Sequence, residues 1–267
     1  MTDKPKENWG GAEAYEKYVG RWSRLIAQEF LAWIAVPSQA AWADVGCGTG
    51  ALAECILAQY DPKFISGIDK ADGFVAAARQ IKDRRVSFET GDATALPWNN
   101  HTFDVAVSGL VLNFVPDHNA MAKEMVRVTK PGGKVAAYVW DYAEGMEMMR
   151  HFWDVAIEVS PDDSALDQAE RFPICRPEAL QELFHAVGLR SVSSRAIEVP
   201  TVFRSFDDYW RPFLGKQGAA PTYLASLDET TCEKIRRALE SPLKPSADGA
   251  IHLKARAWAV QGIVKQN

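Results

Sequence analysis

The chain has 267 residues, of which 47% are hydrophobic and 24% are charged, and its formal net charge is −5. These values are typical of a globular protein and exclude the basic composition that phosphate-neutralising nucleic-acid binders need. The densest basic cluster, residues 82–85, is interrupted by Asp83. We therefore expect no nucleic-acid partner, and because no apolar run reaches the length of a bilayer, we expect no membrane span.

The four cysteines are scattered along the chain, and no pair has the spacing of metal ligands or of a disulfide framework. We therefore predict no metal site. Residues 1–8 are polar and contain no apolar h-region, so we expect no secretory signal and a cytoplasmic location.

The first predicted element is a long amphipathic helix. Apolar and aromatic residues recur at helical spacing from Tyr15 to Ile34, and the pattern ends near residues 36–37, where Pro37 follows.

A glycine-rich turn comes next. Gly46, Gly48 and Gly50 stand at alternate positions, after the apolar run 40–43 and before a helical pattern at 51–57. This order predicts a strand, a tight turn and a helix start, the arrangement in which a nucleotide-like ligand contacts bare backbone. Glycine suits the turn because it lacks a Cβ and tolerates a positive φ.

The turn fits two kinds of ligand. A dinucleotide site takes the form G-x-G-x-x-A, which Gly46, Gly48 and Ala51 satisfy. A methyl-donor site takes an acid followed by G-x-G-x-G, which Asp44 and the glycines up to Gly50 satisfy. The glycines alone do not choose between the two.

The next two strands each end near an acid. Residues 63–68 predict a strand that ends at Asp69, nineteen residues after Gly50, where an acid is expected to bind ribose hydroxyls of either cofactor. Residues 86–89 predict a third strand, closed by Asp92 and Ala93. A carboxylate there can accept a hydrogen bond from the exocyclic amine of adenine.

The alternation of strand and helix continues to residue 139. Residues 103–107 predict a fourth strand, residues 120–129 a helix, residues 130–133 a turn, and residues 134–139 a fifth strand. This alternation predicts a mostly parallel sheet with helices on both faces.

Taken together, these motifs resemble the class I S-adenosylmethionine (SAM)-dependent methyltransferases, and among them the small-molecule group that includes ubiquinone- and menaquinone-biosynthesis enzymes. The resemblance covers roughly residues 10–140 and rests on residues 44–50, 67–69, 91–97, 103–117 and 131–133. It implies a Rossmann-like, doubly wound, mostly parallel seven-stranded sheet whose last strand is antiparallel, with SAM as the cofactor.

The resemblance also implies which residues contact the cofactor. Gly46, Cys47, Gly48 and Gly50 would line its methionine end, with Asp44 near the ammonium group.

The nucleoside end would be held by the later strands. Asp69 would bind the ribose hydroxyls, Lys70 would lie against the adenine, and Asp92 and Ala93 would hold the adenine edge. Asp92 also suits the role of a helix N-cap. The residues that would close over the sulfonium are Ser108 and Leu110.

The leading helix would fold over the same pocket. Its Tyr18 and Trp22 are expected either to approach the methionine moiety or to pack in the core, and Arg21 and Arg24 either to pair with the cofactor carboxylate or to face solvent.

Beyond the fifth strand we predict a helix at 176–188, a strand at 192–199, helices within 206–213 and 230–239, and a final strand at 250–264 that pairs antiparallel with the preceding one. The whole chain, 1–267, is expected to form a single SAM-binding methyltransferase domain. Ligands bind outside the carboxyl ends of strands in such sheets. The segments 141–176 and 202–248 are therefore predicted to be helical cap insertions.

Methyl transfer from a sulfonium needs chiefly alignment and exclusion of water, and needs a base only where the acceptor retains its proton. Weak candidates for such a base are His118, Asp141, Tyr142 and His151. Residues 113–117 lack the Asp/Asn-Pro-Pro-aromatic signature of enzymes that methylate exocyclic or amide nitrogens.

We therefore predict a SAM-dependent methyltransferase whose partner is a small, partly apolar acceptor methylated at carbon or oxygen. Two alternatives stay open: an NAD-type oxidoreductase, because of the dinucleotide form of the turn, and a SAM-binding protein without turnover, because no base is evident.

Overall fold

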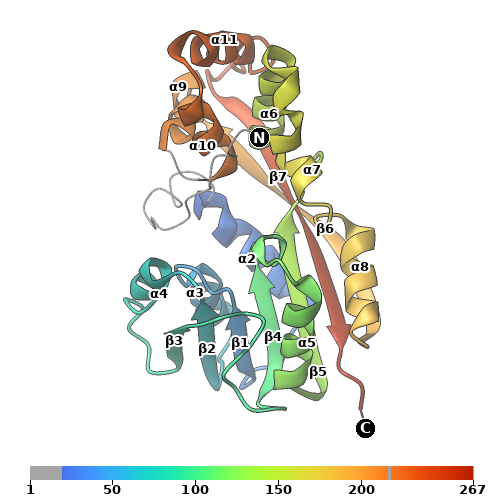
Figure 1. Cartoon of the computed structure of the whole chain (residues 1–267). Coiled ribbons are helices and arrows are strands. Elements are labelled where there is room, and N and C mark those ends of the chain that lie inside the picture. The colour runs from blue at the N-terminus through green and yellow to red at the C-terminus, as the bar shows by residue number, and fades with distance from the viewer. Residues whose placement is uncertain (1–19, 216–217, 267) are drawn as a thin grey trace. The chain divides into compact units, whose positions relative to one another are not determined.

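The structure, a computed structural model, describes residues 20–215 and 218–266 (Figure 1). They group into two compact units. We call one the sheet unit; it contains Ser23–Trp140, Ile174–Ile197 and the chain from Ala257. We call the other the helical unit; it contains Asp141–Pro173, Glu198–Arg256 and the chain up to Trp22.

A seven-stranded sheet has the order β3-β2-β1-β4-β5-β7-β6. The neighbouring pairs among β1 to β5 are parallel, and β7 runs antiparallel to β5. The predicted mixed sheet is thereby confirmed (Figure 1). The strands are β1 Ala41–Val45, β2 Phe64–Asp69, β3 Val86–Thr90, β4 Phe103–Gly109, β5 Thr129–Trp140, β6 Arg190–Phe203 and β7 Ile251–Ile263.

Helices connect the parallel strands and pack on the sheet. All five residues of β1 are buried, as expected for a central strand that is covered on both faces. Helix α4 contacts β2 and β3, α5 contacts β4 and β5, and α8 contacts α5. The helices of the sheet unit are α2 Arg21–Ile34, α3 Ala51–Gln59, α4 Asp72–Ala78, α5 His118–Val128 and α8 Pro177–Ala186. The first residues of α2, Arg21 and Trp22, belong to the helical unit.

One prediction within the sheet was wrong. Residues 130–133 are not a turn before the fifth strand but lie within β5, which begins at Thr129. Phe103 pairs with Thr129 while Val105 pairs with Lys134, so β5 bulges over these residues. These residues still form a hydrogen bond of the strand type, in which the N–H of Gly132 donates to the carbonyl of Val264 at 3.0 Å.

The helical unit has an aromatic core. Phe152 stacks on Phe213 with ring centroids 4.6 Å apart, and Tyr209 lies 5.3 Å from Phe213 while its hydroxyl donates to the carbonyl of Met148. The unit includes α6 and α10, whose bounds the sequence pattern did not predict, as well as the expected α9 and α11. Its elements are α6 Glu147–Val159, the 3-10 helix Pro161–Leu166, α7 Gln168–Arg171, α9 Phe206–Trp210, the 3-10 helix Arg211–Gly215, α10 Ala219–Ser226 and α11 Glu229–Glu240.

Within the described part of the chain, every helix is too short or too polar to pass through a lipid bilayer.

Candidate functional site

The glycine turn joins β1 to α3 and follows the carboxyl end of β1. Gly46, Gly48 and Gly50 all have positive φ, at 77°, 53° and 88°. The N–H of Gly46 donates to the carbonyl of Ile68 at 2.7 Å, which ties the turn to β2. A Cβ on Gly46 would lie 2.5–2.7 Å from the side chain of Val111, so the close approach of these two segments requires glycine.

Asp69 ends β2 and faces this turn. Its Oδ2 accepts a hydrogen bond from the N–H of Gly48 at 2.9 Å, and its Oδ1 accepts one from the N–H of Ala71 at 2.9 Å. Burial raises the pKa of Asp69, and the backbone hydrogen bonds oppose that rise. The carboxylate is therefore positioned by backbone groups while each oxygen retains a further lone pair for a ligand hydroxyl.

Asp44 lies on β1 and is 1% exposed. Neither of its oxygens has a hydrogen-bond partner among the described residues. Burial, and to a lesser extent the negative charge of Asp69, raise the pKa of Asp44 to about 7. A buried carboxyl group without a partner is costly, so it points to a ligand that supplies the missing donors.

Asp92 and its neighbours follow β3. Asp92 is exposed, and its Oδ1 accepts from both the backbone N–H and the hydroxyl of Thr94. These bonds lower its pKa. They close a turn rather than start a helix, so the interpretation of Asp92 as a helix N-cap was wrong. Lys70 is exposed near Asp92, and Ala93 is half-buried.

The segment after β4 holds further buried polar groups. Ser108 is fully buried, and its hydroxyl has no partner among the described residues. Leu110 has a φ of 62°, an uncommon value for a residue other than glycine, and its N–H donates to the carbonyl of Tyr138 at 2.8 Å.

Sequence reasoning missed Asn113, which lies in the 3-10 helix Leu112–Phe114. It is 5% exposed, and both its amide oxygen and its amide nitrogen lack partners in the part of the chain that the structure describes. The sequence signal was weak: one Asn within the run from Val111 to Phe114.

The structure thus brings together carboxylates from the ends of three neighbouring strands. Asp44 and Asp69 lie on adjacent β1 and β2, and Asp92 follows β3, which pairs with β2. The bare backbone of the glycine turn lies beside the first two acids. Such a constellation can bind a ligand that carries both hydroxyl and cationic donors.

The remaining predicted cofactor contacts are Tyr18, Trp22 and Cys47, of which Tyr18 precedes the described residues. Trp22 is 4% exposed in the helical unit, where its ring meets the ring of Phe203 edge-on at 5.3 Å. Cys47 is buried within the glycine turn, and burial raises the pKa of its thiol, so it stays protonated.

Two of the four candidate bases, Asp141 and Tyr142, are consecutive residues after β5, and the other two lie on α5 and α6. Both oxygens of Asp141 are engaged, since Arg256 contacts Oδ2 at 2.6 Å and the N–H groups of Ala143 and Glu144 donate to Oδ1 at 3.1 Å. His118 begins α5, and partial burial lowers its pKa.

Tyr142 and His151, like Asp141, belong to the helical unit. Tyr142 is buried against Phe172, with ring centroids 5.6 Å apart, and His151 lies half-buried on α6. These contacts do not select one of the four, so the identity of a base stays a prediction.

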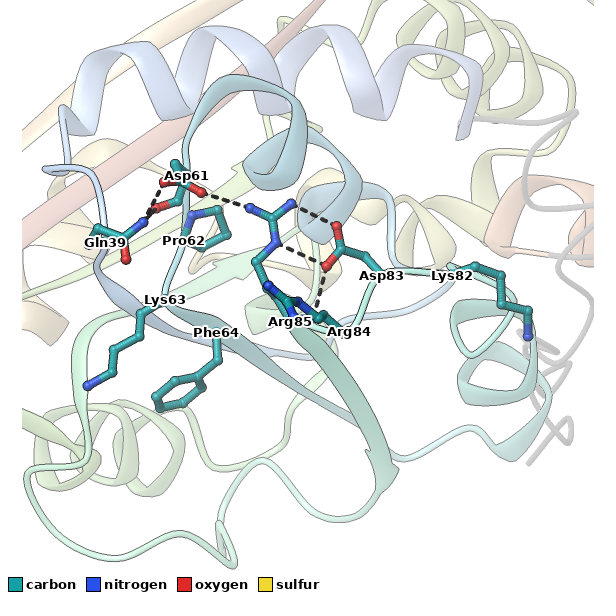
Figure 2. Close-up of a pocket in the computed structure, with 9 residues that line it drawn as sticks. All are labelled: Gln39, Asp61, Pro62, Lys63, Phe64, Lys82, Asp83, Arg84 and Arg85. Atoms are coloured by element: carbon teal, nitrogen blue, oxygen red, sulfur yellow. Dashed lines mark hydrogen bonds and ion pairs between the residues drawn. The ribbon is translucent and has the colours of Figure 1, made fainter.

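A pocket of about 700 Å³ lies at the opposite ends of these strands. Lys63 and Arg85 in its wall precede β2 and β3 (Figure 2). Arg85 lines the pocket, with one guanidinium nitrogen 2.9 Å from Asp61 and another 2.7 Å from Asp83. Parallel sheets bind ligands at their carboxyl ends, and this pocket lies at the amino ends of β2 and β3. We therefore assign its ion pairs a structural role, that of joining the starts of these two strands.

Comparison of the sequence with known protein families also points to a methyltransferase. Residues 43–137 match the family described as "Methyltransferase domain". The mixed seven-stranded sheet and the glycine turn with its acids agree with this match, and together they support a SAM-dependent methyltransferase of class I.

Within that class the chain is similar to the quinone-biosynthesis group. It is 28% identical over 179 residues to 2-methyl-6-phytyl-1,4-hydroquinone methyltransferase of Synechocystis sp., covering 66% of this chain and 55% of that protein. It is 33% identical over 136 residues to demethylmenaquinone methyltransferase of Shouchella clausii, covering 45% and 57%. It is also 28% identical over 137 residues to trans-aconitate 2-methyltransferase of Variovorax paradoxus, covering 51% and 52%.

The chain therefore matches about half the length of these curated relatives. Among solved structures, it resembles the fold of phosphoethanolamine N-methyltransferase 2 of Haemonchus contortus in complex with S-adenosyl-L-methionine. The TM-score is 0.58 at 17% identity, covering 95% of this chain and 56% of that one.

Proposed function

We propose that this chain binds SAM at the carboxyl ends of β1 to β4 and transfers its methyl group to a small molecule. The observation that carries the proposal is Asp44, whose carboxyl group is 1% exposed and has no hydrogen-bond partner among the described residues, beside a turn whose Gly46 is packed against Val111. An unpaired acid at this depth matches the cationic methionine end of SAM, and the bare turn admits its backbone-like atoms.

Different residues of the sheet unit bind different parts of the cofactor. Asp44 holds the ammonium group, and Asp69, already oriented by the N–H of Gly48, accepts from the ribose hydroxyls. Asp92 with the adjacent Ala93 and Lys70 holds the adenine, at the end of β3 next to β2. Ser108 and Leu110 line the side of the sulfonium, with Gly46, Cys47, Gly48 and Gly50 below the methionine chain.

SAM supplies a methyl group that is already activated by its positive sulfur. The protein residues therefore orient the two reactants in line and exclude water, which lowers the entropic part of the barrier. Burial of Asp44, Ser108 and Asn113 shows that this end of the sheet is dry enough for charge interactions to be strong.

We further propose that the acceptor is partly apolar and is methylated at carbon or oxygen. Support comes from the names of two relatives, which act on a hydroquinone and on demethylmenaquinone. Residues 113–117 also lack the motif of enzymes that methylate exocyclic or amide nitrogens. The segments 141–176 and 202–248 are proposed to supply the residues that select this acceptor, and the chain is proposed to act as one domain.

Two measurements test the proposal. Calorimetry with S-adenosylhomocysteine (SAH) and with NAD separates the methyl-donor site from the dinucleotide site: we expect SAH to bind and NAD not to bind. Labelled-methyl transfer from SAM into a metabolite extract then separates an enzyme from a binding protein. Binding of NAD in preference to SAH would overturn the cofactor, and SAH binding without transfer to any extract component would overturn the activity.

A further inference from the structure

Two opposite charges on α5, which we call the α5 ion pair, are Glu124 and Arg127. They are three residues apart, so their side chains lie on one face of the helix. Nε of Arg127 lies 2.6 Å from Oε1 of Glu124, and Nη2 lies 2.6 Å from Oε2. In this geometry a guanidinium and a carboxylate share two parallel hydrogen bonds and fix each other's plane. The hydrogen bonding from Arg127 lowers the pKa of Glu124, so the carboxylate stays charged.

The α5 ion pair holds both backbone polar groups of Leu96. The N–H of Leu96 donates to Oε2 of Glu124 at 2.7 Å, and its carbonyl accepts from Nη2 of Arg127 at 2.9 Å. Nη1 of Arg127 continues along the same segment. It donates to the carbonyl of Trp98 at 2.7 Å and to the side-chain oxygen of Asn100 at 2.9 Å. Every N–H group of this guanidinium thus has an acceptor.

The segment that these bonds hold joins β3 to β4. Residues 91–102, which the structure describes in full, contain no helix or strand. A turn at the start of the segment is closed by the N–H of Ala95, which donates to the carbonyl of Asp92 at 3.1 Å. Leu96 comes next and is 6% exposed. Because a loop has no repeating backbone hydrogen bonds, side chains must fix its position, and here the α5 ion pair does so.

The same turn carries the residues proposed to hold adenine. Asp92 and Ala93 follow β3, at the edge of the sheet where the carboxyl ends of the parallel strands lie. Hydrogen bonds to the edge of a base weaken steeply when their distance or angle departs from the ideal, so the turn must be held in place. By holding Leu96, the α5 ion pair keeps the turn where it can reach a base.

We infer that Glu124 and Arg127 are positioning residues for recognition of the cofactor's base. They hold Leu96, and through it the turn at Asp92, in the place from which Asp92 and Ala93 bind the edge of adenine. This role rests on the proposed function. It gives α5 a part in ligand selectivity, although none of the proposed cofactor contacts lies on that helix.

A purely structural ion pair would behave differently. Its loss would weaken every ligand of the sheet unit alike, whereas loss of a positioning pair falls on the contact with the exocyclic amine of adenine. Two probes separate these cases. One is SAH, and the other is S-inosylhomocysteine, in which hypoxanthine replaces adenine, so that an oxygen stands where adenine carries its amine.

Calorimetry measures both probes against the full-length wild type, Arg127→Met, Arg127→Lys and Glu124→Gln. Arg237→Met is the matched control, because Arg237 lies 2.7 Å from Glu233 on the exposed side of α11, in the helical unit. We expect wild type to prefer SAH about tenfold or more, since the carboxylate of Asp92 would face an oxygen in the other probe.

We expect Arg127→Met to weaken SAH about tenfold and S-inosylhomocysteine much less, so that the preference largely disappears. Arg127→Lys keeps the charge but loses the planar fork, and should restore only part of the preference. Arg237→Met should bind both probes as wild type does. In an Asp92→Ala background, Arg127→Met should no longer change the preference, because the side chain that it positions is gone.

Amide hydrogen exchange of the unliganded chain tests the contact itself. The N–H of Leu96 should exchange about tenfold faster or more in Arg127→Met, because it loses its oriented acceptor. The N–H of Ile65, which donates to the carbonyl of Arg85 at 2.7 Å, should keep its rate and show that the sheet stays folded. If Arg127→Met fails to fold, the nearly isosteric Glu124→Gln takes its place in every measurement.

Four results would overturn this role. They are an unchanged preference in both Arg127→Met and Glu124→Gln, equal losses for the two probes, the same change in Arg237→Met, and a wild type that binds both probes equally well. A wild type that binds neither probe would instead contradict the proposed function, and the positioning role would fall with it.

Discussion

The carboxylate of Asp69 accepts a hydrogen bond from the backbone N–H of Gly48, 2.9 Å away, so the last residue of β2 supports the turn that follows β1. In the opposite direction, the N–H groups of Gly46 and Cys47 in the turn donate hydrogen bonds to the carbonyl of Ile68 on β2. These hydrogen bonds hold β1, β2 and the glycine turn together. We therefore expect a substitution in β2 or in the turn to change the affinity for a bound nucleoside.

Asp69→Ala tests this coupling. The variant loses two backbone hydrogen bonds and the acceptor for the ribose, so we expect SAH to bind at least tenfold more weakly and the free energy of unfolding to fall by about 1–2 kcal/mol. Asp72→Ala is the control, since among the described residues Asp72 accepts a hydrogen bond from the hydroxyl of Thr90 at an exposed position. Calorimetry and urea unfolding check both numbers, and equal SAH affinity in the two variants would contradict the role of Asp69.

Asp44 makes stability depend on pH. The pKa of its carboxyl is near its ordinary 3.8 when unfolded and about 7 when folded, so between these values the folded state binds the extra proton. Stability is therefore highest at low pH in this window and is lost as the pH rises through 7, by at most about 4 kcal/mol. Asp69 adds a smaller slope of the same sign, because its pKa is raised as well.

Urea unfolding at pH 5 and pH 8 measures this effect. Asp44→Asn should remove most of the difference between the two pH values and be more stable than wild type at pH 8. SAH binding should release protons near pH 7 in wild type, because the ligand's ammonium group favours the ionised carboxylate, and should release fewer in the variant. An unliganded wild type whose stability is flat from pH 5 to pH 8 would show that Asp44 is not desolvated.

The sequence predicted the methyl-donor turn because its chemistry is local. The alternate glycines, the acid before them and the acid at the end of the next strand are recognised from their spacing alone. In the structure they lie at or next to the carboxyl ends of β1 and β2. The bulge at 130–133 was missed because its conformation is set by the carboxyl-terminal residue Val264, more than a hundred positions away.

The unpartnered groups could not be predicted from the sequence. Asn113 and Thr201 are ordinary polar residues in the chain, and only three-dimensional packing shows that they are buried and lack hydrogen-bond partners among the residues that the structure describes. Similarly, segment 141–176 was expected to be helical, but the bounds of α6 were not predicted, because apolar residues such as Met148 and Trp153 fit either a pocket lining or the buried face of a helix.

Gly46→Ala and Gly48→Ala separate packing from backbone strain. Both glycines have positive φ, but a Cβ at Gly46 would contact Val111 whereas a Cβ at Gly48 has no neighbour within 4 Å. We expect Gly48→Ala to cost about 1 kcal/mol from strain and Gly46→Ala about 3 kcal/mol from strain plus overpacking. Urea unfolding measures both, and Gly46→Ala combined with Val111→Ala should recover the packing share only. Equal costs for the two single variants would mean that the loop after β4 moves freely away.

Arg256→Met tests whether Asp141 is part of a structural ion pair. Arg256 contacts Asp141 at 2.6 Å, and the Asp141 side chain is 3% exposed, so the variant leaves a buried charge unpaired. We expect it to lose about 3 kcal/mol of stability by urea unfolding. Arg237→Met is the matched surface change, because its pair with Glu233 is 75% and 44% exposed, and it should cost under about 0.5 kcal/mol. Similar small costs for both would free Asp141 for the role of a base.

Asn113→Leu separates a ligand contact from a structural hydrogen bond. The amide of Asn113 is 5% exposed and has neither donor nor acceptor partner among the described residues, so replacing it by an apolar group of similar size removes a desolvation penalty. The unliganded variant should therefore unfold at the wild-type temperature or slightly above it, with a gain of about 1 kcal/mol at most. If the amide contacts the cofactor or the acceptor, methyl transfer or the thermal shift that SAH produces should fall in Asn113→Leu and stay unchanged in Asn119→Leu, an exposed position on α5. A drop of several degrees in the unliganded variant would instead show that Asn113 stabilises the fold, and unchanged transfer together with an unchanged SAH shift would remove it from the site.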